Sequence, residues 1–86
     1  MPLVCVHGPL RQLAGFAGEH RLQAGTVLDL LRELECVYPA LSGWIVDERG
    51  LIRRHIKVFV NGERGGEHTA VAADARVETL PAITGG

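Results

Sequence analysis

The segment TVLDLLRELECVYP, residues 26–39, carries the clearest periodic signal in the chain and predicts one amphipathic helix. Its apolar side chains follow the three-and-four spacing of a single buried stripe: Val27, Leu30, Leu31, Leu34 and Tyr38. Thr26 is a good N-cap, and Asp29 sits where a capping box places its acidic residue. Pro39 ends the helix because the residue before a proline avoids helical dihedral angles.

A strand pattern lies after the helix, in HIKVFVNG at residues 55–62. Apolar and polar side chains alternate there, as in a strand with one face on the core. The side chains expected on the core face are Ile56, Val58 and Val60, and those on the open face are His55, Lys57 and Phe59. Asn61-Gly62 is a strong hairpin signal. One short edge strand is expected around residues 69–71.

The last strand is expected at RVETL, residues 76–80. Val77 and Thr79 would face the core, which leaves Glu78 and Leu80 on the open face. Phe59 and Leu80 would then share that face if their strands are neighbours. An apolar cluster on an open sheet face is typical of a docking surface for a partner.

Before the helix, Leu3–Val6 is an apolar, β-branched run that predicts a first strand. Residues 10–18 are punctuated by glycine and predict a loop from which Leu10 and Phe16 turn inward. Residues 19–23 predict a second strand with Leu22 as its apolar anchor.

Residues 40–54 have no clear period. We expect a long packed connection with one short helical turn, folded over an edge of the core. Its apolar members are Leu41, Trp44, Ile45, Leu51 and Ile52.

Two hairpins flanking one helix predict an α+β domain of the β-grasp, ubiquitin-like type, with a mixed sheet wrapped around the helix. The last strand is expected at the centre of the sheet, beside the first. The domain is assigned to residues 1–80 and a C-terminal tail to residues 81–86.

The tail reads PAITGG and has no charged side chain. Pro81 is expected to stop sheet pairing because it has no N–H to donate. Six extended residues reach at most roughly 20 Å, enough to enter a narrow channel. Two terminal glycines lack Cβ atoms, so their backbone fits a slot that excludes other residues. A frayed terminus is the plainer interpretation of such an end.

Composition narrows the function classes. A chain of 86 residues with 47% hydrophobic residues and a net charge of −1 predicts one folded domain. The lack of a basic block argues against nucleic acid as a partner. The apolar runs are too short to span a bilayer, and no signal-peptide pattern is present, so a cytoplasmic location is expected. Cys5 and Cys36 are expected to be reduced packing residues.

Chemistry-bearing residues are scattered. His7, His20, His55 and His68 show no ligand spacing, so no metal site is predicted. Neither cysteine lies beside a base, and no residue is assigned a catalytic role. The glycine-rich stretch at residues 62–66 lacks the context of a phosphate-binding loop and predicts a hairpin turn.

The chain resembles the MoaD/ThiS family of ubiquitin-like sulfur carriers, near its CysO-like branch. The resemblance is carried by VFVNGE at residues 58–63, by Asp74 with Val77, and by LPAITGG at residues 80–86. It implies a protein that is carrier and substrate, not an enzyme. No cofactor is implied to stay bound, and ATP would be used by the activating partner.

The resemblance further implies that an E1-like adenylating enzyme of the MoeB/ThiF type activates Gly86. Sulfur then converts Gly86 to a thiocarboxylate that a sulfur-accepting synthase uses, and a metalloprotease that trims the tail is a further candidate partner. Gly85 would permit access to the activating site. The residues implied to contact partners are Phe59, Leu80, Pro81, Ala82, Ile83 and Thr84.

Several pathways stay open at this point. The Leu-Pro-Ala segment at residues 80–82 favours biosynthesis of cysteine or another sulfur metabolite over thiazole synthesis. A MoaD-like role in molybdopterin synthesis comes second, since such carriers commonly have two prolines where this chain has Pro81-Ala82. Conjugation to proteins through Gly86 and a plain binding module are the remaining alternatives. The residues do not identify the sulfur acceptor, the activating enzyme, a precursor or the oligomeric state.

Overall fold

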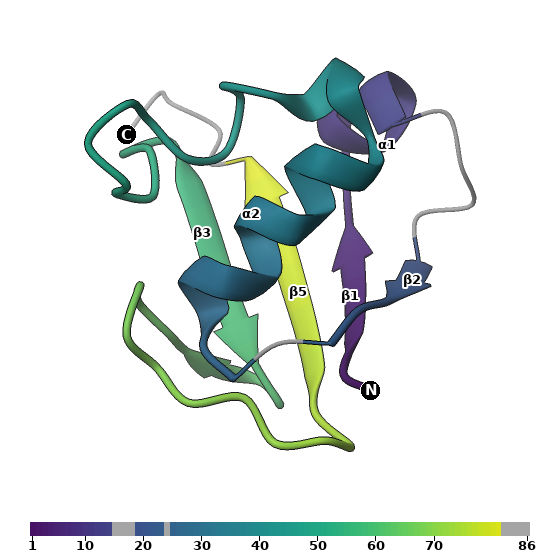
Figure 1. The fold of residues 1–86 in the computed structure, drawn as a ribbon, viewed down its shortest axis with the longest axis vertical. Helices are drawn as coiled ribbons and strands as arrows, with labels where there is room; N and C mark the ends of the chain where they lie inside the picture. The colour runs from purple at the N-terminus through teal and green to yellow at the C-terminus, as the bar shows by residue number, and fades with distance from the viewer. Residues whose placement is uncertain (15–18, 24, 82–86) are drawn as a thin grey trace.

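The computed structural model describes residues 1–14, 19–23 and 25–81. It shows a five-stranded sheet in the order β2-β1-β5-β3-β4, crossed on one face by the main helix, α2 (Figure 1). The elements are β1 (Leu3–Val6), α1 (Pro9–Ala14), β2 (Glu19–Arg21), α2 (Val27–Val37), η1 (Pro39–Leu41), β3 (Ile56–Val60), β4 (Glu63–Arg64) and β5 (Arg76–Pro81). β5 runs parallel to β1 and antiparallel to β3, so the sheet is mixed and the last strand is central. The expected β-grasp architecture is confirmed.

Helix α2 forms where its periodic pattern predicts. The Thr26 hydroxyl accepts a hydrogen bond of 3.2 Å from the Asp29 amide, which caps the first turn. Its buried residues are Val27, Leu30, Leu31 and Leu34. Burying each such side chain contributes about 1.5–3 kcal/mol relative to exposure. The helix therefore supplies one side of the core, and the sheet supplies the other.

Residues 9–14 form a short helix, α1, where a loop was expected. Pro9 occupies the first helical position, which suits a residue with a fixed φ and no N–H. Leu10 is buried, as expected, whereas Phe16 lies outside the described residues. A helix of six residues is too short to show a repeating apolar pattern, so the sequence gives little sign of it. β2 ends at Arg21, two residues before the expected end, and the buried Leu22 follows it directly.

The connection before β3 contains η1, which confirms the expected short helical turn, and then a small hairpin. The Arg53 amide donates to the Ile45 carbonyl at 2.9 Å, and Val46 bridges Ile52. Leu41 and Ile45 are fully buried, but Trp44 is 51% exposed and Leu51 is 41% exposed. The expectation that all five apolar residues pack inward was therefore wrong for these two. Trp44 lies in the turn that follows η1 and Leu51 follows the turn of the hairpin, so neither side chain is held against the core by a regular pattern.

The edge strand is β4, at residues 63–64, and the expected position around residues 69–71 was wrong. Asn61 and Gly62 adopt positive φ values of 52° and 86°, which make a two-residue turn. Such a turn sends the chain straight back, so the residues directly after it pair with β3. Ala70 instead makes an isolated bridge to Thr26. Within the described part of the chain, no helix is long and apolar enough to cross a membrane.

Candidate functional site

The root of the C-terminal tail is held at the centre of the sheet. β5 continues through Pro81, which lies opposite Ile56, so the strand ends one residue later than expected. A proline is tolerated there because the last residue of a strand need not donate to the ladder. On the other side of β5, the His7 amide donates to the Thr79 carbonyl at 3.1 Å. Strand pairing therefore fixes the point from which the tail leaves.

Beyond Pro81, the tail falls outside the residues that the structure describes. The predicted sites Ala82, Ile83, Thr84, Gly85 and Gly86 belong to this part. Their roles in adenylation, sulfur transfer and partner contact stay predictions.

The open face of the sheet places Phe59 and Leu80 together, as expected. In the β3–β5 pairing, Phe59 lies opposite Glu78 and Lys57 lies opposite Leu80, so all four side chains share the face away from α2. Phe59 and Leu80 are diagonal neighbours, which in such a pair are about 7–8 Å apart, within reach of an aromatic ring. Both are half-buried. The face thus offers two apolar side chains flanked by one cation and one carboxylate.

An ion-paired row crosses the same face over β1. The Arg76 guanidinium lies 3.1 Å from a Glu78 oxygen and 3.7 Å from a Glu19 oxygen. Both carboxylates belong to residues that pair with Cys5, whose side chain is only 1% exposed. Burial raises the pKa of the Cys5 thiol, with the nearby Arg76 charge acting in the opposite direction. Cys5 is therefore a packing residue, as expected.

Cys36 does not match its predicted packing role. It is exposed on α2, because it lies outside the three-and-four stripe that faces the sheet. Both cysteines are free thiols. In residues 1–14, 19–23 and 25–81, no three His, Cys, Asp or Glu side chains gather closely enough to hold a metal ion.

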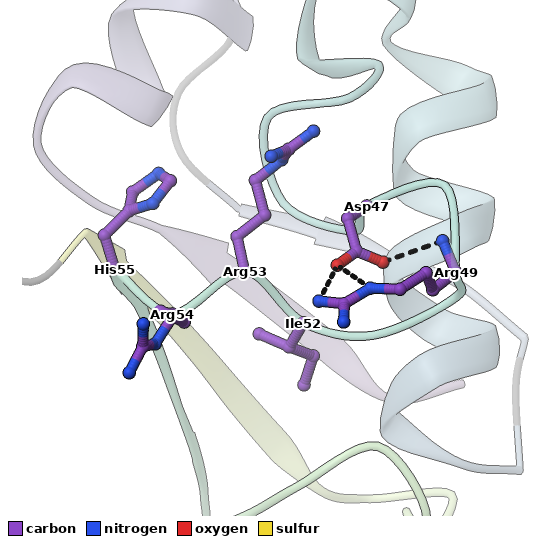
Figure 2. A pocket seen from close by; sticks show the side chains of 6 residues that line it. All are labelled: Asp47, Arg49, Ile52, Arg53, Arg54 and His55. Atoms are coloured by element: carbon purple, nitrogen blue, oxygen red, sulfur yellow. Dashed lines mark hydrogen bonds and ion pairs between the residues drawn. The ribbon is translucent and has the colours of Figure 1, made fainter.

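A cluster of basic side chains near the tail root was missed by sequence reasoning. One shallow hollow is lined by Gly43, Trp44, Arg53 and His55. A second, shown in Figure 2, is lined by Asp47, Arg49, Ile52, Arg53, Arg54 and His55. Arg53, Arg54 and His55 precede Ile56, the residue that pairs with Pro81. The run Arg-Arg-His before a strand is visible in the sequence, but its place beside the tail root depends on strand pairing.

Asp47 organises the loop that carries this cluster. Its carboxylate accepts hydrogen bonds from the Arg49 guanidinium at 2.8 and 3.1 Å, and from the amides of Arg49 and Leu51 (Figure 2). The hydrogen bond from the Arg49 side chain is the main cause that lowers the pKa of Asp47. Asp47 is therefore already committed to Arg49 and the backbone.

Comparisons with known proteins relate the whole chain to one group. The model of the ThiS family matches residues 4–86. SAMP1 from Haloferax volcanii is similar with 28% identity and a TM-score of 0.87, over 99% of this chain and 98% of that one. A chain of the BexX/CysO complex of Amycolatopsis orientalis is similar with 27% identity and a TM-score of 0.86, over all of both chains. CysO from Mycobacterium tuberculosis is similar with 27% identity and a TM-score of 0.84, over 96% of this chain and 100% of that one. No curated protein sequence matched.

Proposed function

This chain belongs to the ThiS family, and we propose that it carries sulfur as a thiocarboxylate on Gly86. The observation that carries the proposal is the family match, which runs through the terminal Gly85-Gly86 pair. The placement of β5 supports it, because a tail that leaves the centre of the sheet has a root held by strand pairing on both sides. In this proposal the folded domain supplies the scaffold and, at residues such as Phe59, the surface that contacts partners. The tail supplies the carbonyl group that reacts.

The chemistry requires a separate activating protein. A C-terminal carboxylate has a pKa near 3.5 and is ionised at neutral pH, so it is a poor electrophile. An E1-like enzyme would join a Gly86 carboxylate oxygen to the α-phosphorus of ATP and release pyrophosphate. Hydrosulfide would then attack the Gly86 carbonyl carbon, and AMP would leave with the oxygen. The product is the thiocarboxylate, which donates sulfide in a second enzyme.

Cysteine or a related sulfur metabolite is the product that we favour. Two observations support cysteine or a related metabolite over molybdopterin: the similarity to two structures that contain CysO, at 27% identity, and the Leu-Pro-Ala segment at residues 80–82. The BexX/CysO complex also supports a role in which the carrier binds another protein. A MoaD-like role in molybdopterin synthesis is the alternative within the same chemistry.

Conjugation to proteins is the second candidate function. Haloferax volcanii SAMP1, a small archaeal modifier protein, is similar in two crystal structures at 28% and 27% identity. The same activated Gly86 carbonyl would then be attacked by a lysine amine instead of sulfur. Lysine-containing peptides that carry a tail remnant would favour this function, and their absence under several growth conditions would argue against it.

The deciding experiment weighs the C-terminal peptide of protein isolated from its native host. Trypsin cleaves after Arg76 and releases residues 77–86, which contain neither Cys nor Met. A mass gain there is therefore not ordinary sulfur oxidation. Replacement of one oxygen by sulfur is the expected result. An unmodified peptide, found again after incubation with ATP, sulfide and the host's activating enzymes, would contradict the proposal, and a chain lacking Gly86 is the control.

A further inference from the structure

The side chains of Trp44, Arg53, Arg54 and His55 form a surface that we call the basic corner. It lies where the hairpin of residues 45–53 meets the start of β3. Ile56, the next residue along the chain, lies opposite Pro81. Any protein that takes up the tail beyond Pro81 must therefore come close to the basic corner.

The two arginines of the basic corner have no carboxylate partner in the described part of the chain. In residues 1–14, 19–23 and 25–81, neither Arg53 nor Arg54 forms an ion pair. Among the described residues, the Arg53 guanidinium donates to the backbone carbonyl of Gly43 and to no carboxylate. Arginines are expected to find a planar, bidentate acceptor when they take part in recognition. The surface thus holds positive charge that the described part of the chain leaves unmatched.

Three carboxylates on the hairpin of residues 45–53 or against it are already used. Asp47 binds Arg49, as described above, and Glu35 and Glu67 hold the backbone, whereas Glu48 interacts electrostatically with Arg49. Glu35 accepts from the amides of Ile45 and Val46 at 3.1 and 3.0 Å. Glu67 accepts from the amide of Ile52 at 2.9 Å, which is the main cause that lowers its pKa. These bonds fix the loop's shape and leave none of the three carboxylates free for Arg53 or Arg54.

The geometry favours a broad acidic surface over a single small anion. Figure 2 shows the side chains of Arg53 and His55 extending to one side of the chain segment and that of Arg54 to the other. With Trp44, these side chains line two adjoining hollows, and a protein surface can span both. Trp44 adds an exposed indole next to Arg53 and His55. Tryptophan and arginine are the side chains that most often anchor protein interfaces.

We propose that the basic corner docks an acidic surface on the enzyme that activates the tail, and that this contact helps select that enzyme. The inference rests on the proposed function and adds a recognition site to it. Charges at such a contact act mainly on the rate of encounter and on the choice of partner. Changing them should therefore alter KM more than kcat. The attraction weakens as salt rises, because the Debye length is about 8 Å at physiological ionic strength.

The test measures ATP–pyrophosphate exchange by the host's activating enzyme with the full chain as substrate. Arg54→Glu should raise KM about tenfold with kcat unchanged, and Arg53→Glu/Arg54→Glu should raise it further. Arg21→Glu is the matched control, because Arg21 is an exposed arginine on β2, at the opposite edge of the sheet. Wild-type KM should rise with salt more steeply than that of the Arg54→Glu chain. Circular dichroism checks that each variant is folded.

Equal KM values for Arg54→Glu, the double variant and Arg21→Glu would overturn the docking inference and leave the carrier function standing. A wild-type chain that no activating enzyme of the host adenylates would overturn the proposed function and the docking inference together.

A photo-crosslinking residue in place of Trp44 provides a second, catalysis-independent readout. The expected product joins position 44 to an acidic segment of the activating enzyme. An Arg54→Glu chain should regain its low KM when an acidic residue of that segment is changed to arginine. Crosslinks to a basic or apolar surface, or to a second copy of this chain, would contradict the inference.

Discussion

Gly8 lies against the ring of Pro81, so closely that a Cβ on Gly8 would stand 3.2 Å from the Pro81 Cγ. Gly8 has a φ of 62°, in the left-handed region that glycine adopts without strain. The turn after β1 therefore packs directly on the residue from which the tail leaves. Glycine at position 8 therefore allows both the left-handed backbone conformation and the close contact with Pro81.

Replacing Gly8 by alanine should destabilise the fold. A left-handed conformation costs an L-residue about 1–2 kcal/mol, and the contact with Pro81 adds to that cost. We expect a loss of about 1–3 kcal/mol in the free energy of unfolding, measured by urea denaturation. Gly25→Ala is the control, because within the described residues no atom lies within 4 Å of its Cβ position. Equal denaturation midpoints for the two variants would argue against this account of Gly8.

Phe59→Asp should weaken binding to partner enzymes without unfolding the domain. Phe59 lies on the open face and is half-buried, so a carboxylate there remains hydrated. We expect an unchanged circular dichroism spectrum and a KM for activation raised about tenfold or more, in the range of an interface anchor. Val58→Asp is the contrasting variant, because Val58 is buried and an aspartate there should unfold the chain. Loss of structure in Phe59→Asp would instead show that Phe59 belongs to the core.

Thr79→Val should stabilise the protein. Thr79 is fully buried on the core side of β5, and its hydroxyl has no hydrogen-bond partner in the part of the chain that the structure describes. An unsatisfied buried hydroxyl costs about 1–3 kcal/mol, and valine has nearly the same shape. A gain of about 1 kcal/mol in the free energy of unfolding is expected. Thr79→Ser keeps the hydroxyl and loses a methyl group, so it should be destabilising; a destabilised Thr79→Val chain would mean that the hydroxyl has a partner.

Stability should fall in acid partly through Asp47 and Glu67. The pKa of each is lowered in the folded state, Asp47 mainly by the Arg49 side chain and Glu67 mainly by the Ile52 amide. A carboxyl group whose pKa is lowered on folding stabilises the protein at pH values above its unfolded-state pKa, which is about 4. That stabilisation is lost as the pH falls through the folded-state pKa. Urea midpoints between about pH 2.5 and pH 7 should therefore drop at the acid end.

The Asp47→Asn chain separates the Asp47 contribution. It should be less stable at neutral pH and should lose less stability in acid than the wild type, because the titrating group is gone. Arg49→Ala removes the main cause of the lowered pKa, so its acid loss should be smaller and should be complete at a higher pH than in the wild type. Identical pH profiles for wild type and Asp47→Asn would refute the role given to this carboxylate.

The two cysteines should react at very different rates with a thiol reagent. Cys36 is exposed, whereas Cys5 is buried beneath the ion-paired row and its thiol pKa is raised. The thiolate is the reacting form, so Cys5 should label only as the protein unfolds. Labelling followed by peptide mass should find one modified site in native protein. Cys36→Ser should abolish the rapid phase, and rapid labelling of that variant would show that Cys5 is accessible.

Local patterns in the sequence were enough to predict the helix, the main strands and the fold class. The stripe from Val27 to Leu34, the alternation from Ile56 to Val60 and the Asn61-Gly62 turn each depend on near neighbours along the chain. The sequence also predicted that Phe59 and Leu80 share one face of the sheet, because side chains alternate between the two faces along each strand and the two strands pair. The roles of Gly85 and Gly86 rest on the tail sequence and stay predictions.

Contacts between distant segments were decided only by the tertiary structure. The sequence did not show that Trp44 is exposed, that β4 follows the turn directly, or that Arg54 lies beside the root of the tail. Each depends on which strands pair and in which register, and a short segment fits several pairings equally well until the core is packed. Burial of α2 against the sheet selects one register, and that register brings the basic corner to Pro81.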